Sequence, residues 1–129
     1  MADYVVEPSP AIAGRLRVPG DKSISHRAVM FGAIASGTTH VTGFLEGEDC
    51  LSTMKAVAQL GVSVHRPAPG EVRVEGVGLR GLRAPDGVLD ICNAGAAMRL
   101  FMGLMAAQPF DTELIGESSL MRRRVERVA

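Results

Sequence analysis

The chain has 129 residues, of which 47% are hydrophobic and 22% are charged, and its 14 basic residues balance its 14 acidic residues. These values are typical of one globular domain and exclude a disordered chain. Without net charge there is no general attraction to nucleic acid or to a membrane surface. Anion binding would therefore depend on local clusters of charge.

The cysteines and the N-terminus limit the cysteine chemistry and the cellular compartment that the sequence predicts. Cys50 and Cys92 form neither a disulfide framework nor a metal-ligand spacing, and the three histidines lie far apart in the sequence. We expect two reduced, small core cysteines and no metal site. The first ten residues lack the features of a signal peptide. The longest apolar stretch contains Arg99 and is too short to span a bilayer, so the expected location is the cytosol.

The first half of the chain predicts β-α-β-α-β-β order. Residues 14–18 alternate and predict a short strand. A helix is expected from Ser23 or Ser25, either of which could cap it, to Ser36, with Gly37 as its stop. Residues 38–44 are rich in β-branched side chains and predict a strand.

A second amphipathic helix is expected after this strand. Asp49 is its candidate N-cap and Gly61 its C′ residue. The alternating segments VSVHR and EVRVE, joined by PAPG, then predict a hairpin.

The last third predicts a strand at 88–92, a helix in NAGAAMRLFMGLMAA, a strand at 110–116 and a helix from ESSLMRRR onward. The first of these helices is apolar on nearly every side, so we expect it to be buried.

The last third also resembles the first. HRAVMFGAIASGTTHVTG can be laid over MRLFMGLMAAQPFDTELIG, which places Arg27 over Arg99 at an offset of about 72 residues. We therefore expect an α/β fold with a β-α-β-α-β-β unit used twice, at about 14–76 and, incompletely, at about 86–129. Nothing supplies the closing hairpin of the second unit, so the sequence predicts an incomplete chain.

The first helix start, GDKSISHR, gathers groups that bind anions. A helix N-terminus exposes unpaired N–H groups and a partial positive charge. Lys22 and Ser23 lie at this start, and His26 and Arg27 follow one turn later, on what we expect to be the same face. Lysine and arginine together suit a phosphate or a carboxylate. The structural alternative is a serine cap with solvated cations, and His26 is expected to be structural.

The second helix start, CNAGAAMR, offers Asn93 as a cap or donor, small residues at Gly95 and Ala96, and Arg99 one turn inside. The alternative here is an ordinary strand-to-helix turn. At the third start, the arginines of LMRRRVER would by themselves be a solvated face. If the two units pack side by side, these starts converge on one surface that suits a doubly charged, oxygen-rich ligand. No nucleophile–base pair is visible.

Five ordered motifs, PGDKSISHR, IASGTTHVTG, LEGED, NAGAAMR and GESSLMRR, resemble those of the 5-enolpyruvylshikimate-3-phosphate synthases, or 3-phosphoshikimate 1-carboxyvinyltransferases. The resemblance covers the chain from about residue 14 onward. It implies a cytoplasmic, monomeric transferase of the shikimate pathway, which leads to chorismate and the aromatic amino acids. Such enzymes move the enolpyruvyl group of phosphoenolpyruvate to the 5-hydroxyl of shikimate 3-phosphate, and they need no metal or organic cofactor. The resemblance further implies two lobes of three units each, with ligands in the cleft between them, and no nucleic-acid or membrane partner.

The resemblance also implies roles for individual residues. Lys22 would contact both substrates and is the only candidate catalytic residue. Ser23 and Arg27 would hold shikimate 3-phosphate, and Gly95 and Arg123 would hold phosphoenolpyruvate. The residues that would support the site are Asp49, Asn93 and Arg99.

Four positions depart from the family pattern. Cys92 stands where the family usually has glycine, and Ala96 where it often has threonine. Arg124 and Val125 replace an expected proline and methionine, which affects the setting of Arg123. Gly95 keeps the small residue that the resemblance associates with sensitivity to glyphosate-like mimics.

Two other functions stay open. One is a non-catalytic phosphate-binding fragment. The other is the related transferase that acts on UDP-N-acetylglucosamine, although GDKSISHR favours shikimate 3-phosphate. The principal carboxylates of the family lie in sequence that this chain lacks, so we expect negligible turnover from the isolated chain.

Overall fold

The computed structural model describes residues 2–122. In chain order these residues form α1 (Lys22–Ile34), β1 (Ser36–Thr42), α2 (Glu48–Gln59), β2 (Ser63–His65), β3 (Glu71–Val77), β4 (Leu89–Asp90), α3 (Gly95–Ala106), β5 (Leu114–Ile115) and α4 (Ser118–Met121). None of the helices in this part of the chain has the length and apolar character that a bilayer crossing requires.

Helix α1 begins one residue after an aspartate cap. The Asp21 carboxylate accepts the backbone N–H of Ile24 at 2.7 Å, which satisfies one of the free amides of the first turn. The prediction of Ser23 or Ser25 as the cap is therefore wrong. The Ser25 hydroxyl instead donates to the Asp21 carbonyl and accepts the backbone N–H of Leu45. Serine in this position joins the helix start to the loop before α2.

The ends of α1 and α2 follow local backbone chemistry. Helix α1 ends at Ile34, and Gly37, with φ of +94°, lies inside β1. The expectation that Gly37 stops the helix is therefore wrong. Helix α2 is capped by Gly47, so Asp49 lies in its first turn and is not the cap. Gly61, with φ of +88°, follows the last turn as predicted.

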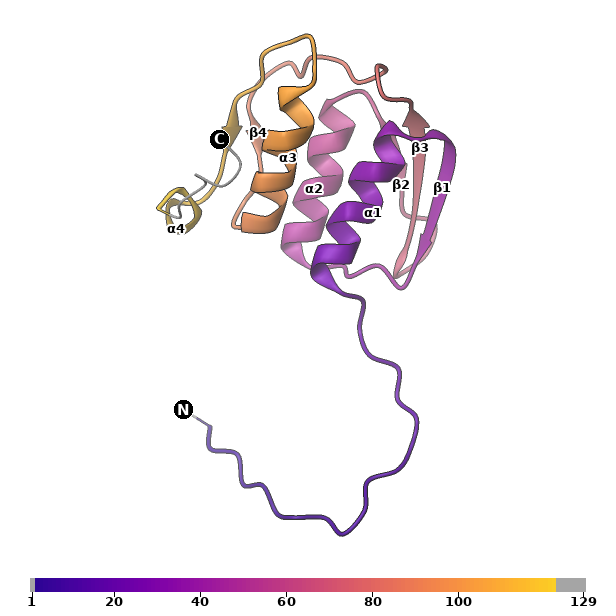
Figure 1. Ribbon diagram of the computed structural model, residues 1–129, viewed down its shortest axis with the longest axis vertical. Helices are drawn as coiled ribbons and strands as arrows, with labels where there is room; N and C mark the ends of the chain where they lie inside the picture. The colour runs from indigo at the N-terminus through magenta and orange to yellow at the C-terminus, as the bar shows by residue number, and fades with distance from the viewer. Residues whose placement is uncertain (1, 123–129) are drawn as a thin grey trace.

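The first sheet is antiparallel, in the order β1-β3-β2. The register runs from Ser36 opposite Val77 to Thr42 opposite Glu71, and β2 and β3 form the predicted hairpin. Helices α1 and α2 lie side by side over one face of this sheet (Figure 1). The residues buried between the two layers include Val29, Ala33, Val57, Val72 and Val74. Burial of these aliphatic side chains is what stabilises the layered arrangement.

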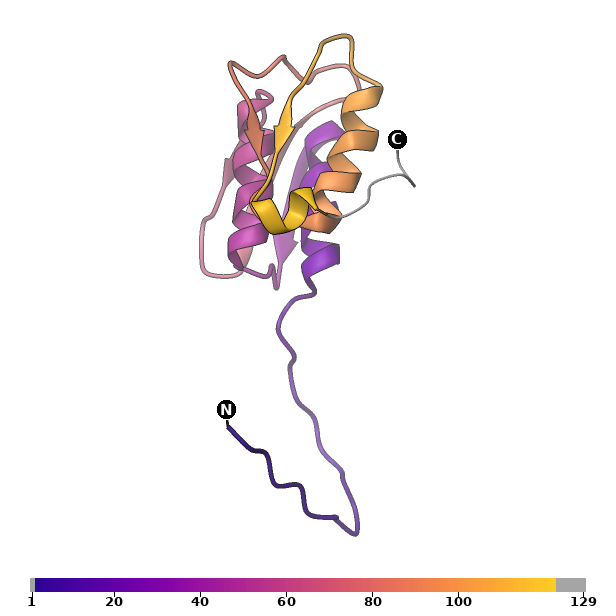
Figure 2. The same ribbon diagram turned by 90° about the vertical axis from the view of Figure 1, so that its left-hand side faces the viewer.

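The second part of the chain is a β-α-β element. Strands β4 and β5 pair in parallel, and α3 connects them (Figure 2). Each strand has two residues, so the predicted strands at 88–92 and 110–116 are too long. Helix α3 buries Ala97, Met98 and Phe101.

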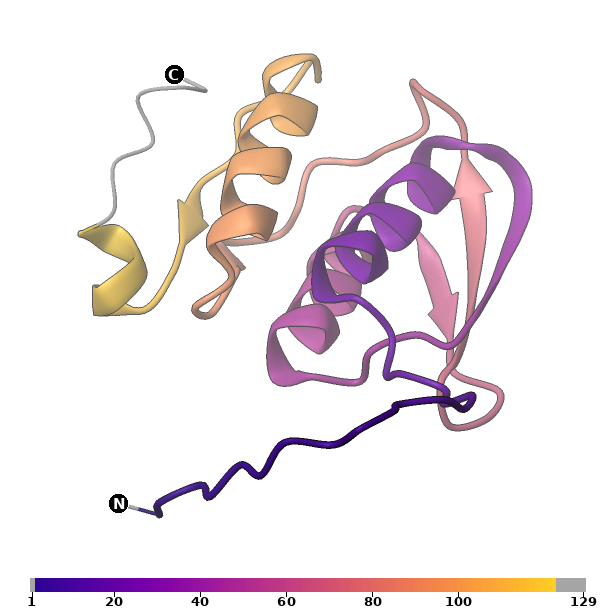
Figure 3. The same cartoon turned by 60° about the horizontal axis from the view of Figure 1, so that its bottom comes forward.

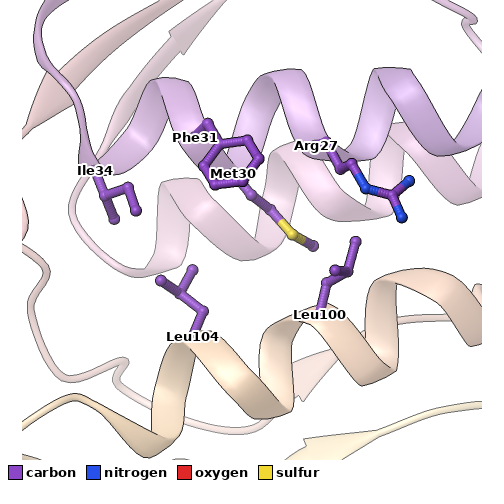
Figure 4. Close-up of a pocket in the computed structure, with 6 residues that line it drawn as sticks. All are labelled: Arg27, Met30, Phe31, Ile34, Leu100 and Leu104. Atoms are coloured by element: carbon purple, nitrogen blue, oxygen red, sulfur yellow. The ribbon is translucent and has the colours of Figure 1, made fainter.

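The opposite side of α3 is less buried than the sequence predicts. Leu100 and Leu104 are only half-buried. They face α1 across an apolar groove of about 190 Å³ (Figure 4), lined by Arg27, Met30, Phe31, Ile34, Leu100 and Leu104. The expectation of burial on nearly every side is therefore only partly right.

Residues 2–20 form no helix or strand, so the predicted strand at 14–18 is wrong. The segment runs away from the helices (Figures 1 and 3), and Leu16 and Val18 are 83% and 69% exposed. A strand needs the backbone of a neighbouring strand for its hydrogen bonds. The alternating sequence of 14–18 meets no such partner within residues 2–122.

Two glycines allow a sharp test of this packing. A Cβ on Gly76 of β3 would lie 2.3 Å from the Ala35 carbonyl oxygen and 2.6 Å from that of Gly32, whereas a Cβ on Gly103 of α3 would meet nothing within 4 Å. We expect Gly76→Ala to lower the free energy of unfolding by about 2 kcal/mol or more, because backbone atoms must shift. We expect Gly103→Ala to raise it by roughly 0.5–1 kcal/mol. Urea unfolding measures both, and equal effects of the two substitutions would contradict the close approach of α1 and β3.

Candidate active site

The first turns of α1, α2 and α3 lie at the same end of the molecule (Figures 1 and 3). We call this end the helix-start rim. The Lys22 ammonium forms an ion pair with the Asp49 carboxylate, which joins α1 to α2. The Ser52 hydroxyl, which donates to the Asp49 carbonyl at 2.7 Å, also lies 3.4 Å from the Ile91 carbonyl, so α2 contacts the segment before α3. Of the predicted helix starts, those at Lys22 and Gly95 lie at this end, whereas the third, LMRRRVER, extends beyond the described residues.

The two cations of the first motif point in different directions. Lys22 lies toward α2, with its side chain 48% exposed and that of Asp49 22% exposed. Arg27 is exposed beside the groove between α1 and α3, and its Nη1 donates to the Ser23 carbonyl at 3.1 Å. The expectation that Lys22, Ser23, His26 and Arg27 share one face is therefore only partly right. The motif presents two adjacent cationic positions on α1.

His26 is fully buried between α1 and α2. Its Nδ1 lies 2.8 Å from the Thr53 hydroxyl, and its Nε2 has no hydrogen-bond partner within the described residues. Burial, followed by the positive charge of Lys22, lowers the pKa of His26 below its ordinary value, and Asp49 opposes this only in part. The ring is therefore neutral near neutral pH and does not reach a ligand on the rim.

The start of α3 is built from small residues. Ala94 precedes the helix and no side chain caps it, so Asn93 is not a cap. The Asn93 Oδ1 instead accepts the Ser119 hydroxyl at 2.9 Å, which joins this start to α4. Gly95 is buried, and its N–H donates to the Asn93 carbonyl at 3.2 Å. A helix start leaves its first N–H groups without a carbonyl partner inside the helix itself. Without a capping side chain, the backbone amides themselves form this part of the rim.

Arg99 repeats the contact of Arg27. Its Nη1 donates to the Gly95 carbonyl at 2.9 Å, four residues earlier, as Arg27 donates to Ser23. Both guanidinium groups are therefore held near the first turn of their helix. The sequence alignment predicted above places these two arginines over each other.

Cys92 is half-buried, so the expectation of a core cysteine is wrong for this residue, while Cys50 is fully buried as expected. Cys92 has φ of +50°, in the left-handed region. Its N–H donates to Asp90 Oδ1 at 2.8 Å, and its carbonyl accepts the N–H of Glu117 at 2.9 Å. Burial raises the pKa of both thiols above the ordinary cysteine value. Both therefore stay protonated at neutral pH and are poor nucleophiles.

Other residues of the predicted site take no part in the contacts of the rim. Arg123, with its neighbours Arg124 and Val125, lies outside the described residues. Ala96 is half-buried in the first turn of α3. Glu46, in the LEGED motif, is structural: its Oε1 accepts from Arg66 at 2.7 Å and from the Gly70 N–H at 3.1 Å, and these bonds lower its pKa.

Across residues 2–122, no group of histidine, cysteine and carboxylate side chains is arranged to hold a metal ion.

Sequence reasoning missed the partners that fix the rim. Asp21 immediately precedes the helical pattern, which was a usable cap signal. Thr53 gave no such signal, because its role depends on α1 lying beside α2. The same holds for Ser52 and Ile91, which are 39 residues apart.

The helix starts of this α/β domain bring lysine and arginine side chains to one rim, an arrangement that can bind an anion. The family model described as EPSP synthase (3-phosphoshikimate 1-carboxyvinyltransferase) matches residues 6–129. The chain therefore belongs to the EPSP synthase family.

Individual relatives agree with this assignment. Proteins named 3-phosphoshikimate 1-carboxyvinyltransferase from Alkalilimnicola ehrlichii and Hydrogenovibrio crunogenus are 56% and 54% identical over 98% and 97% of this chain. A solved EPSP synthase from Acinetobacter baumannii superposes with a TM-score of 0.83 at 55% identity, over 88% of this chain and 26% of that one. The chain spans about 28% of the length of the two named relatives.

The backbone at Cys92 predicts an unusual order of stability. At an ordinary φ, alanine is more stable than glycine because it restricts the unfolded chain. At φ of +50°, only glycine avoids the left-handed penalty of about 1–2 kcal/mol. We therefore expect Cys92→Gly to be more stable than Cys92→Ala by about 1 kcal/mol. Paired urea denaturation curves compare the two variants, both of which lack the thiol, and a more stable alanine variant would contradict the backbone assignment.

The lowered pKa of His26 predicts a pH dependence of stability. Because the folded chain disfavours the protonated ring, the unfolded chain binds more protons as the pH falls below the ordinary value of 6.5. The contribution of the neutral ring to the free energy of unfolding is complete above this pH and is lost as the pH decreases through it. Thermal or urea unfolding between about pH 7 and pH 5 should show a steeper loss for the unaltered chain than for His26→Gln. Parallel curves would mean that His26 titrates normally in the folded chain.

Proposed function

We propose that this chain forms the N-terminal part of an enzyme that transfers the enolpyruvyl group of phosphoenolpyruvate to the 5-hydroxyl of shikimate 3-phosphate and releases phosphate. The observation that carries the proposal is the helix-start rim, in a chain that belongs to the EPSP synthase family. A rim of backbone amides and cations suits two phosphorylated substrates.

The chemistry explains why such a rim is needed. Two anionic substrates must approach each other and pass through a tetrahedral adduct, so their repulsion has to be screened. Fixed cations and helix N-termini provide this screening without reorganisation during the reaction. Tight phosphate binding also holds the hydroxyl against the enol carbon. Lys22 is the proposed group nearest the reacting atoms, and Asp49 orients its ammonium.

The remaining roles follow the family motifs. Ser23 and Arg27 bind shikimate 3-phosphate on the α1 side of the rim, in addition to Lys22. Gly95 leaves room for phosphoenolpyruvate at the start of α3, and Arg123 binds its charge. Asn93 and Arg99 support the α3 start through their contacts with Ser119 and the Gly95 carbonyl.

The isolated chain has no turnover in this proposal. General acid–base groups are required to form and break the adduct, and the principal carboxylate candidates of the family lie in later sequence. The reaction uses no metal or organic cofactor. The whole enzyme acts as a monomer in the cytosol, with its ligands between two lobes.

The repeat supports the placement of the rim. We propose that residues 14–76 and 86–129 are two copies of one repeated unit, the second incomplete. The first copy has the order α-β-α-β-β in the structure, without the strand predicted at its start. The matching contacts of Arg27 and Arg99 support this equivalence. Two helix starts related by a repeat can then face one cleft.

The alternative functions are less well supported. The relatives compared above carry the name of the shikimate 3-phosphate enzyme, which disfavours UDP-N-acetylglucosamine as the acceptor. A non-catalytic phosphate-binding fragment would respond to any phosphate equally.

Titration of the chain with shikimate 3-phosphate, followed by ¹⁵N NMR, tests the proposal. We expect the amide signals around Lys22 and Arg27 to shift, and Lys22→Ala to weaken binding by at least about tenfold because a charge-assisted contact is lost. Lys55→Ala, at an exposed position of α2, is the matched control and should bind normally.

Inorganic phosphate and UDP-N-acetylglucosamine are the comparison ligands. Equal response to inorganic phosphate would favour the phosphate-binding fragment, and binding of only the nucleotide sugar would favour the related transferase. Product formed by the purified chain from both substrates would contradict the claim that it lacks turnover.

A further inference from the structure

Two polar contacts join α1 to α2 on successive turns. The outer one is the ion pair between Lys22 and Asp49, and the inner one is the hydrogen bond between His26 and Thr53. Each pair is separated by 27 residues in sequence. His26 follows Lys22 by four residues and Thr53 follows Asp49 by four, so each helix presents its two partners on one row.

The inner contact is an unusual choice for a buried position. His26 and Thr53 are fully buried, and the His26 Nε2 has no partner within the described residues. An unpaired buried polar atom opposes folding, so an apolar side chain would be the more stable occupant. A hydrogen bond has an angular requirement that an apolar contact lacks. The hydrogen bond between His26 and Thr53 therefore restrains the orientation of α1 against α2, although the unpaired buried nitrogen lowers the stability of the fold.

In the second copy of the proposed repeat, an apolar side chain occupies the position of His26. In the alignment, Met98 stands over His26 and Ala94 stands over Lys22. Met98 is buried in α3 with 6% of its surface exposed. The copy that has the lysine thus has the histidine, and the copy that lacks the lysine has methionine. In this comparison, the buried histidine occurs together with the exposed lysine of the rim.

We propose that His26 is a positioning residue: its hydrogen bond to Thr53 fixes the rotation of α1 against α2 and so holds the Lys22 ammonium beside Asp49 on the rim. The role of this ammonium toward substrate rests on the proposed function above. Binding groups must be held within about 0.5 Å of their productive positions. A rigid contact one turn below Lys22 provides this control.

The surroundings of the ring are compatible with the role. The charged groups that face it are Lys22 and Arg27 on α1 and Asp49 on α2. A neutral ring adds no repulsion to the two cations. The Thr53 hydroxyl also lies 3.4 Å from the Asp49 carbonyl, so it can donate there while it accepts from the ring. The inner contact is thereby connected to the backbone of Asp49, which belongs to the outer ion pair.

Lysine labelling tests this proposal without any substrate. The chain contains two lysines, Lys22 and Lys55, so [¹³C]lysine gives one side-chain signal from the rim and one exposed reference. We expect Thr53→Val, which removes the hydroxyl and keeps the shape, to move the Lys22 signal to the position and mobility of Lys55. Thr53→Ser, which keeps the hydroxyl, should retain the signal of the unaltered chain.

A hydroxyl on the sheet serves as the control. Thr38 donates to Glu75 at 2.8 Å on the exposed side of the sheet, and Thr38→Val should leave the Lys22 signal unchanged. An unchanged Lys22 signal in a folded Thr53→Val chain would overturn the proposal, as would equal loss in the serine and valine variants. If the valine variant does not fold, imidazole ¹⁵N NMR of the unaltered chain decides, because a ring without a hydrogen bond at Nδ1 would overturn it.

Substrate affinity separates this proposal from the proposed function. Thr53→Val should weaken shikimate 3-phosphate binding by about tenfold, the factor that corresponds to about 1.4 kcal/mol, while Thr53→Ser binds normally. If the unaltered chain does not bind this ligand, the proposed function fails, and the lysine signal still decides the role of His26. Normal affinity of the valine variant, in a chain that does bind, would overturn the link between His26 and the site.

Discussion

The arrangement of the rim depends on the parallel packing of α1 and α2 over one sheet face. Because the two helices run in the same direction, their N-termini meet at one end, and Lys22 reaches Asp49. The buried residues Val29 and Val57 hold the layers together. Helix α3 joins the same end through its contact with α1 and through the contact between Ser52 and Ile91. Hydrophobic packing in the core thus sets the spacing of polar groups at the edge.

This arrangement separates stability from recognition. The core is apolar, whereas the rim contains an exposed ion pair, a start of α3 without a side-chain cap among the described residues, and a backbone strained at Cys92. Exposed ion pairs contribute little to folding. Under the function proposed above, fixed charges at these helix starts screen the repulsion between two anionic substrates.

Much of the fold was predictable because it rests on local pattern. The period of apolar residues located α1, α2 and α3 within a few residues, and alternation located the hairpin of β2 and β3. The strand at 14–18 failed because alternation says nothing about whether a pairing partner exists. The caps failed because Asp21 and Gly47 competed with equally plausible neighbours. The half-buried face of α3 depends on what lies across it, which composition cannot report.

By itself, the sequence determined which side chains have the chemistry to bind anions, where the helices lie to within a few residues, and that the chain has the motifs of one family. These properties are local, since they depend on side-chain type and on spacing within one element. The tertiary structure decided that Lys22 meets Asp49, that Arg27 lies beside α3 instead, and that His26 is buried against Thr53. These contacts join residues on different elements, and they arise only when the apolar faces of the helices have been buried and their rotation has been fixed.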